Sequence, residues 1–278
     1  MSVLEEIIAG VRADVERRKS EVSGAEIERL AREAKPALDV VERLRRCETL
    51  GLFAEVKRSS PSKGSLADIP DPAHLAGAYE EGGATAISVL TEERRFSGSL
   101  RDLDAVRERV SVPVLRKDFM VEDYQIFEAR AHGADVVLLI VAALCDAQLR
   151  DMYSLTRSLG MRVLVETHTP EELERALASD AELIGVNARN LKTLDVDLHY
   201  ACALLEAVPS DRLAVGSRPW QLSTTLRPMR VPELMPFSSV RHSCGTRIPR
   251  RRRATFAVLS GSAEQGADTR TFEKRSGK

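Results

Sequence analysis

Residues 131–141 read AHGADVVLLIV and residues 80–90 read EEGGATAISVL, so a similar phrase occurs twice along the chain. In both phrases a Gly-Ala pair ends a helical pattern and an apolar, β-rich run follows at once, which is typical of a glycine that caps a helix before a strand. Residues 179–188, SDAELIGVNA, make the same transition without the glycine. These junctions predict that helices and strands alternate.

The alternation starts at residue 51 and continues to residue 215. We expect strands at 52–56, 84–90, 112–116, 136–141, 162–165, 183–186 and 212–215. We expect helices near 72–82, 99–109, 122–132, 146–159, 170–179 and 197–207. Strands joined by helices of this length need right-handed parallel crossovers. Because no GxGxxG follows the first strand, the pattern favours an α/β fold of the (β/α)8 TIM-barrel type over a dinucleotide-binding sheet.

Charge divides the chain at one point. From residue 216 onward there are 11 Arg and 2 Lys against 4 acidic residues, whereas the first 215 residues carry 28 basic and 38 acidic ones. Such a shift usually marks a change of segment type. We therefore predict an N-terminal helical extension over 1–46, a barrel with seven strands over 47–215, and a basic, Pro- and Arg-rich tail over 216–278 that is expected to be disordered.

Other compositional features narrow the class of protein. No apolar run approaches the ~20 residues needed to span a bilayer, and the N-terminus does not read as a signal peptide. The scattered cysteines form no CxxC pair, which favours a reduced, cytoplasmic setting. No cluster of His, Cys and Asp has metal-ligand spacing, so we predict neither a metal nor another cofactor.

Charged and amide side chains stand at the ends of four expected strands. They are Glu55 and Lys57 on the first strand, Lys117 on the third, Glu166 on the fifth, and Asn187 and Arg189 on the sixth. Chemistry in (β/α)8 barrels is performed at the C-terminal ends of the strands, and side chains from odd-numbered strands share a layer. We therefore expect Glu55, Lys57, Lys117 and Glu166 to converge, with burial lowering the pKa of Lys117 so that it suits a general acid.

Each of these residues alone has an ordinary structural explanation. The stretch GLFAEVKRSSPSKGSL, residues 51–66, could be a surface turn after an edge strand, and Lys117 could be a solvated strand cap. His168 follows Glu166 in a loop, and without an evident partner it is expected to be exposed. Thr169 is expected to cap the next helix, with acidic residues in its first turn.

Five phrases carry a resemblance to a known family. They are FAEVKRSSPSKG (53–64), SVLTEERRFSGSLRDL (88–103), PVLRKDFMVEDYQIFEARAHGADVVLLIV (113–141), LVETHT (164–169) and IGVNARNLKTLDVD (184–197). Together they resemble indole-3-glycerol phosphate synthase, the ring-closing enzyme of tryptophan biosynthesis, from about residue 3 to about 215. The resemblance implies a carboxy-lyase that converts 1-(2-carboxyphenylamino)-1-deoxyribulose 5-phosphate to indole-3-glycerol phosphate, with loss of carbon dioxide and water.

The resemblance also implies roles for matching residues. Lys117 would be the general acid that protonates the ketose carbonyl, and Glu166 would act in the later proton transfers and the dehydration. Glu55 would orient sugar hydroxyls and neighbouring side chains, together with Asn187. The implied substrate-binding residues are Lys57, Ser60, Phe96, Phe119, Asn187 and Arg189, with the two phenylalanines walling the anthranilate ring.

The chain departs from the family pattern after the seventh strand. The family has an Ala-Glu-Ser-Gly phrase whose Glu lines the active site and whose Ser-Gly binds phosphate. Here residues 213–222 read LAVGSRPWQL, which puts Ser217, Arg218 and Pro219 at those positions. No eighth strand with a Gly-rich phosphate loop is recognised, so the last βα units are expected to be missing or disordered and the barrel unclosed, with exposed edges. We hypothesise that the sequence from about residue 216 is out of frame or unrelated.

Two other functions remain open. The chain could be a catalytically inactive, truncated barrel of the same family, or another phosphate-binding TIM-barrel enzyme such as a sugar-phosphate isomerase. The Arg250–Arg253 run could bind nucleic acid, but no aromatic residues interleave with it. We expect a phosphorylated small molecule as the partner, with neither nucleic acid nor membrane, and a monomer is compatible with the sequence.

Overall fold

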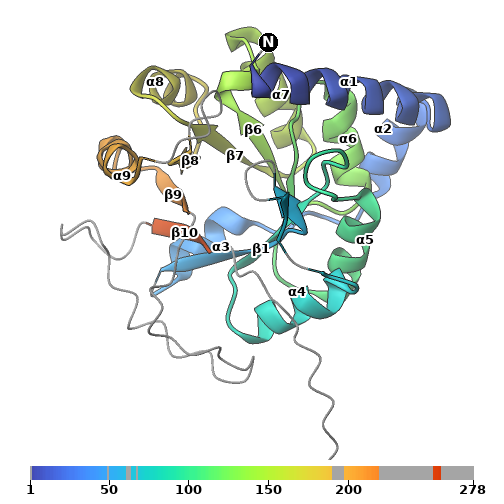
Figure 1. The fold of residues 1–278 in the computed structure, drawn as a ribbon, viewed down its shortest axis with the longest axis horizontal. Helices are drawn as coiled ribbons and strands as arrows, with labels where there is room; N and C mark the ends of the chain where they lie inside the picture. The colour runs from blue at the N-terminus through green and yellow to red at the C-terminus, as the bar shows by residue number, and fades with distance from the viewer. Residues whose placement is uncertain are drawn as a thin grey trace, which may run out of the picture.

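The computed structural model describes residues 2–48, 50–60, 64–66, 68–189, 197–218 and 253–257. Within them, eight parallel strands form a closed barrel surrounded by helices (Figure 1). The barrel strands are β1 (Gly51–Val56), β4 (Ala86–Leu90), β5 (Val114–Lys117), β6 (Val136–Ile140), β7 (Arg162–Thr167), β8 (Leu183–Asn187), β9 (Leu213–Arg218) and β10 (Arg253–Ala257). Around the barrel they follow the order β1-β10-β9-β8-β7-β6-β5-β4, and β4 pairs with β1. The predicted (β/α)8 class is confirmed.

Helices occupy the expected places between the strands. They are α4 (Pro72–Glu81), α5 (Leu100–Arg109), α6 (Asp123–Ala131), α7 (Asp146–Ser158), α8 (Pro170–Ala178) and α9 (Leu198–Ala207), with a short 3-10 helix η1 (Val141–Ala143) after β6. The N-terminal extension folds into α1 (Val3–Glu21), α2 (Gly24–Glu33) and α3 (Val40–Arg46). The boundaries of α4 to α9 lie within a few residues of the predicted ones, because Gly, Pro and capping residues mark the ends of these helices.

Strand β10 was not predicted. Its Thr255 lies opposite Gly216 of β9 and opposite Leu52 of β1, and both pairings are parallel. The barrel is therefore closed rather than unclosed as expected, and the edges of β1 and β9 are covered. A run of arginines directly precedes this short strand and hides it from a pattern-based argument. The expected phosphate loop and the rest of the predicted tail beyond residue 218 lie outside the described residues.

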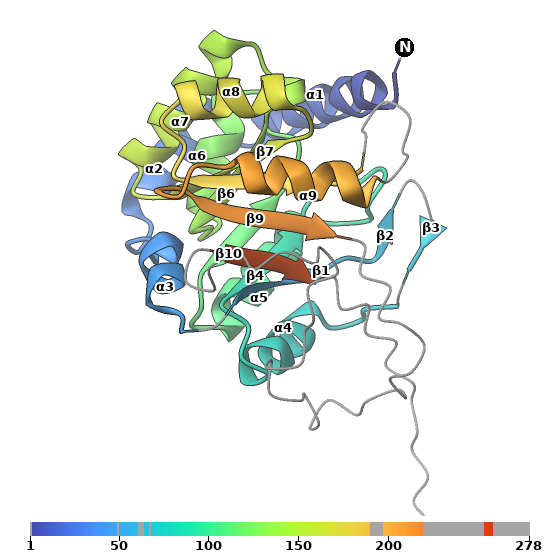
Figure 2. The same ribbon diagram turned by 90° about the vertical axis from the view of Figure 1, so that its left-hand side faces the viewer.

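Strand alternation sorts the apolar side chains into two cores. The inward-facing set includes Phe53, Leu115 and Leu164, and it is continuous with apolar residues of α1, α2 and α3. The outward-facing set includes Val114 and Val165 and packs under the surrounding helices. Figure 2 shows that the strand arrows point toward the end of the barrel where the small hairpin of β2 (Ser59–Ser60) and β3 (Gly64–Ser65) lies, whereas α3 lies at the other end.

A fully buried arginine ties this barrel to its helices. Arg116 is 0% exposed, and its Nη2 lies 3.1 Å from Asp118 Oδ2 and 2.9 Å from Glu128 Oε2 on α6. Glu128 also binds Arg18 of α1, with 2.7 Å between Oε1 and Nε. Burial alone would lower the pKa of Arg116, but the charges of Glu128 and Asp118 raise it above its usual value. The cluster therefore joins β5, α6 and α1 through charges that need one another.

We expect Arg116→Met to lower the free energy of unfolding by about 3–5 kcal/mol, because it leaves two buried carboxylates without their shared cation. Chemical denaturation followed by circular dichroism measures the change. Arg150→Met is the matched control, since the Arg150 side chain is 68% exposed and its ion pair with Asp151 is a surface pair. A loss below about 1 kcal/mol for Arg116→Met would contradict this account of the cluster.

Candidate active site

A lysine and a glutamate from two different strands face each other at the carboxyl end of the barrel. Lys117 ends β5, Glu166 lies near the end of β7, and Lys117 Nζ is 3.7 Å from Glu166 Oε2. The Glu166 side chain is 2% exposed and that of Lys117 19%. Both residues have the inward-facing parity of Leu115 and Leu164. The predicted meeting of these two strand ends is confirmed.

The structure reverses the expectation for the pKa of Lys117. Burial alone would lower that pKa, as predicted, but the negative charges of Glu166 and Glu55 outweigh burial and raise it above its ordinary value. Burial would likewise raise the pKa of Glu166, whereas the charges of Lys117 and His168 and a hydrogen bond from Asn187 hold it below its ordinary value. The pair is therefore an ammonium and a carboxylate at neutral pH.

Asn187 and Arg189 extend this group from β8. Asn187 Nδ2 donates to Glu166 Oε1 at 3.1 Å, and the backbone N–H of Arg189 donates to Asn187 Oδ1 at 3.0 Å. The amide of Asn187 is therefore oriented from one side by the Arg189 backbone, and from the other it holds the Glu166 carboxylate. Glu166 is the residue at which β5, β7 and β8 meet.

Glu55 and Lys57 form a second ion pair at the end of β1. Lys57 Nζ lies 2.5 Å from Glu55 Oε1, and the Glu55 side chain is almost completely buried. Because Glu55 raises the pKa of Lys117, its charge acts on the first pair as well. The expected convergence of the strand-end charges is thus seen in two linked pairs.

Two phenylalanines from neighbouring loops pack beside each other. The rings of Phe96 and Phe119 have centroids 6.2 Å apart and are tilted by 41°. Phe119 follows β5 directly, and Phe96 lies in the loop between β4 and α5. Ser60, the remaining predicted binding residue, lies in β2 and pairs with Gly64 of β3. Its neighbour Ser59 donates its backbone N–H to the Phe96 carbonyl at 3.3 Å, so the two loops are connected.

The loop that carries Phe96 is organised by a buried glutamate that the sequence did not single out. Glu92 accepts backbone N–H bonds from Arg94, Arg95 and Phe96 at 3.1, 2.7 and 2.9 Å. Burial raises the pKa of Glu92 despite these bonds. Three consecutive N–H groups converging on one side chain fix the path of the loop just before Phe96.

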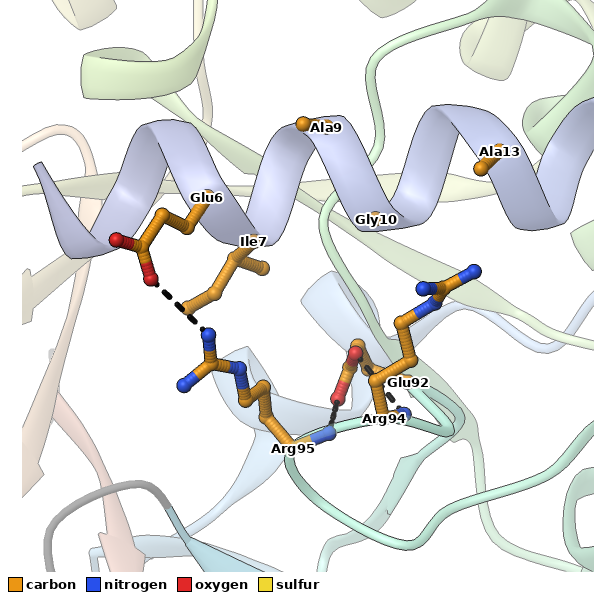
Figure 3. Close-up of a pocket in the computed structure, with 8 residues that line it drawn as sticks. All are labelled: Glu6, Ile7, Ala9, Gly10, Ala13, Glu92, Arg94 and Arg95. Atoms are coloured by element: carbon orange, nitrogen blue, oxygen red, sulfur yellow. Dashed lines mark hydrogen bonds and ion pairs between the residues drawn. The ribbon is translucent and has the colours of Figure 1, made fainter. Parts of the chain in front are cut away.

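Helix α1 holds the same loop from outside. Arg94 forms a two-point ion pair with Asp14, at 2.7 and 2.8 Å, and Arg95 Nη2 lies 3.1 Å from Glu6 Oε2. Figure 3 shows the pocket between α1 and this loop, with the Arg95–Glu6 contact joining the two and the Glu92 bonds within the loop. The residues lining that pocket do not include the strand-end charges, so the pocket marks where the N-terminal extension docks on the loop.

His168 was expected to be exposed in a loop, but it is buried. Its backbone N–H donates to Glu172 Oε2 at 2.7 Å, and its Nδ1 lies 3.0 Å from the same oxygen. Thr169 does cap α8, accepting the Glu172 N–H at 3.2 Å. The four-residue spacing of His168 and Glu172 around this cap was the available sequence signal.

Residues 2–48, 50–60, 64–66, 68–189, 197–218 and 253–257 contain no group of three or more His, Cys, Asp or Glu side chains arranged to hold a metal ion. Among the helices of these same ranges, none is both long and apolar enough to cross a membrane.

We expect Gly98→Ala to disturb the Phe96 loop. A Cβ at Gly98 would lie 2.2 Å from the Leu90 carbonyl oxygen, which is backbone and cannot move aside. The free energy of unfolding should fall by about 1–3 kcal/mol, and KM for any ligand held by Phe96 should rise. Gly24→Ala is the control, since nothing lies within 4 Å of its added Cβ. Denaturation and steady-state kinetics measure both effects, and a Gly98→Ala protein as stable as Gly24→Ala would contradict the prediction.

Comparisons with known proteins identify the family of the chain. The family model described as "Indole-3-glycerol phosphate synthase" matches residues 4–219. Proteins of that name from Arthrobacter sp. (strain FB24) and Micrococcus luteus are each 58% identical over 220 residues, covering 78% of this chain and 81% and 82% of theirs. The protein of that name from Mycobacterium sp. (strain KMS) is 58% identical over 215 residues, which cover 77% of this chain and 79% of its own. The chain belongs to the indole-3-glycerol phosphate synthase family.

Proposed function

We propose that this chain catalyses the family's reaction, the closure of 1-(2-carboxyphenylamino)-1-deoxyribulose 5-phosphate to indole-3-glycerol phosphate with release of carbon dioxide and water. The observation that carries the proposal is the ion pair of Lys117 and Glu166, at 3.7 Å, at the carboxyl end of the barrel. An addition to a carbonyl followed by a dehydration needs a proton donor and a proton acceptor within reach of one small substrate.

Lys117 supplies the first proton. The ring carbon that bears the carboxylate attacks the ketose carbonyl carbon, and the Lys117 ammonium donates a proton to the carbonyl oxygen as its charge develops. The raised pKa of Lys117 supports this role, because the donor is fully protonated at neutral pH before the substrate reacts. Carbon dioxide then leaves, and the electrons of the broken bond restore the aromatic ring.

Glu166 serves the second half of the reaction. The new hydroxyl takes up a second proton, supplied by solvent, and leaves as water, while the adjoining carbon loses a proton to Glu166 and the indole double bond forms. A buried carboxylate whose lowered pKa keeps it ionised can accept that proton, and the Asn187 amide holds it in place at 3.1 Å. Because Lys117 Nζ and Glu166 Oε2 are 3.7 Å apart, the proton that Glu166 accepts from carbon can pass to Lys117 and restore the ammonium for the next turnover.

The remaining predicted residues bind the substrate in this proposal. Phe96 and Phe119, whose rings are 6.2 Å apart and tilted by 41°, wall the anthranilate ring. Lys57 holds an anionic group of the substrate, which competes with Glu55 for the ammonium. Glu55 and Asn187 orient sugar hydroxyls, and Ser60 and Arg189 contribute further polar contacts. We also propose a cytoplasmic location, as suits a biosynthetic enzyme whose partner is a phosphorylated small molecule.

One observation favours the second candidate, an inactive barrel of the same family. In the ladder between β8 and β9, Ser217 lies opposite Asn187, so the strand position at which the family carries an active-site glutamate adjoins the Glu166 group. Serine at this position leaves that group without the carboxylate expected from the family, and Arg218 and Pro219 stand where the family's phosphate-binding Ser-Gly is expected. The chemistry of the first six strands can therefore be intact while substrate binding is impaired.

We expect Lys117→Ala to lower kcat by a factor of about 10²–10⁴, the range typical of a lost general acid. The fluorescence of the indole product measures turnover. Lys35→Ala is the control, since Lys35 is exposed and lies in the connection between α2 and α3. Full ring-closing activity in Lys117→Ala would overturn the assignment.

We expect the combined change Gly216→Ala, Ser217→Glu, Arg218→Ser and Pro219→Gly to raise kcat/KM by about tenfold or more, which corresponds to about 1.4 kcal/mol of recovered transition-state binding. The parent chain is assayed beside it under the same conditions. Equal activity in the two chains would show that this departure has no catalytic consequence.

As a separate check on the origin of the tail, one other reading frame of the coding DNA near codon 216 should encode Ala-Glu-Ser-Gly.

A further inference from the structure

A histidine contacts Glu166 through the carboxylate oxygen that Lys117 does not approach. His168 is one residue beyond β7, and its side chain is 7% exposed. Its Nε2 lies 3.6 Å from Glu166 Oε1, while Lys117 Nζ approaches the other carboxylate oxygen, Oε2. The two oxygens of one buried carboxylate thus face two different nitrogen groups.

The imidazole ring is held from its far side by α8. Glu172 Oε2 is 3.0 Å from His168 Nδ1 and 2.7 Å from the His168 backbone nitrogen, so one carboxylate oxygen fixes both the ring and the backbone that carries it. With Nδ1–H donating to Glu172, the ring directs Nε2 toward Glu166. Among the residues that the structure describes, none makes a hydrogen bond to this buried Nε2.

The charges around the ring favour its protonated form. Burial alone would lower the pKa of His168, but the hydrogen bond to Glu172 and the charges of Glu166 and Glu172 raise it, against a smaller opposing effect of Lys117. The groups that face the ring are thus Glu166 on β7, Glu172 on α8 and Lys117 on β5. An imidazolium at this place lies between two carboxylates, Glu166 and Glu172.

We propose that His168 is a positioning residue for Glu166: braced by Glu172, its imidazolium Nε2–H is directed at Glu166 Oε1 and holds that carboxylate ionised and aimed. Glu172 on α8 thus orients His168, and His168 orients Glu166. The effect on catalysis rests on the ring-closing function proposed above, and His168 acts only through Glu166 because it does not contact the substrate in this proposal.

The positive charge of the His168 imidazolium makes the Glu166-dependent step sensitive to pH. As pH rises through the raised pKa of His168, the imidazolium loses its proton and Glu166 loses one of its two cations. The pKa of Glu166 then rises and its orientation loosens, so the step that depends on Glu166 slows on the alkaline side. The stability that the His168 charge contributes is present below the unfolded pKa of about 6.5 and is lost over the same rise.

The first test needs no catalytic activity. In the intact protein, NMR titration of the His168 ring, identified by its loss in His168→Gln, should give a pKa above about 6.5. Glu166→Gln and Glu172→Gln should each lower that pKa, because each removes an anion that faces the ring. A His168 pKa below about 6.5, or one that Glu166→Gln leaves unchanged, would overturn the proposal. This result stands even if the chain turns out to be inactive, so it separates this proposal from the proposed function.

The second test uses turnover. His168→Gln should lower kcat by about tenfold with little change in KM, and the alkaline decline of the parent profile should disappear, a smaller loss than the 10²–10⁴ of a general acid itself. His132→Gln is the matched control: its Nδ1 also faces a carboxylate, Asp104 at 2.6 Å, but it follows α6 at the end of the barrel where the strands begin. If His168→Gln keeps the kcat and the pH profile of the parent protein, the positioning role of His168 is refuted. If His168→Gln does not fold, the Glu166→Gln titration still decides the question, with the His168 resonance identified by elimination after the other four histidines are assigned through their own Gln variants.

Discussion

A buried carboxylate at the end of β7 is the constraint on which this site depends. Glu166, with a side chain only 2% exposed, could not remain ionised by itself in the barrel interior, because desolvation favours the neutral acid. Its charge is sustained by the Lys117 ammonium and the Asn187 amide, which reach it from β5 and β8. The sheet order β8-β7-β6-β5 and the curvature of the barrel bring those strand ends together, so the fold and the protonation states of the site are set by the same geometry.

The same reasoning explains why the charges at this end of the barrel occur in linked pairs. Glu55 neutralises Lys57 at 2.5 Å and also contributes to the raised pKa of Lys117. Removing one partner of such a pair leaves an uncompensated buried charge, which costs more than the pair itself contributes. Under the proposed function, binding of an anionic substrate exchanges the Glu55 carboxylate for a substrate anion as the partner of Lys57.

Sequence patterns predicted the strands and most helices well but predicted the electrostatics poorly. Apolar runs such as Val136–Ile140 and caps such as Thr169 are local signals, and the structure matches them. The pKa of Lys117 was predicted in the wrong direction, because burial is a local inference and the Glu166 charge that reverses it comes from a strand distant in sequence. His168 was expected to be exposed for a similar reason, since its burial depends on how α8 packs. β10 was not predicted because a five-residue strand next to a run of arginines is too short to show a strand periodicity.

Closure and chemistry place different demands on the last part of the barrel. β10 closes the barrel through parallel backbone pairing with β9 and β1, and backbone pairing accepts many sequences. The chemistry, in contrast, needs particular side chains at particular register positions. Ser217 occupies the ladder position opposite Asn187, so the backbone ladder continues past the Glu166 group whichever residue stands at this position. A closed barrel is therefore weak evidence for activity, and the residues at the ends of β5, β7 and β8 are the part of the structure from which activity has to be argued.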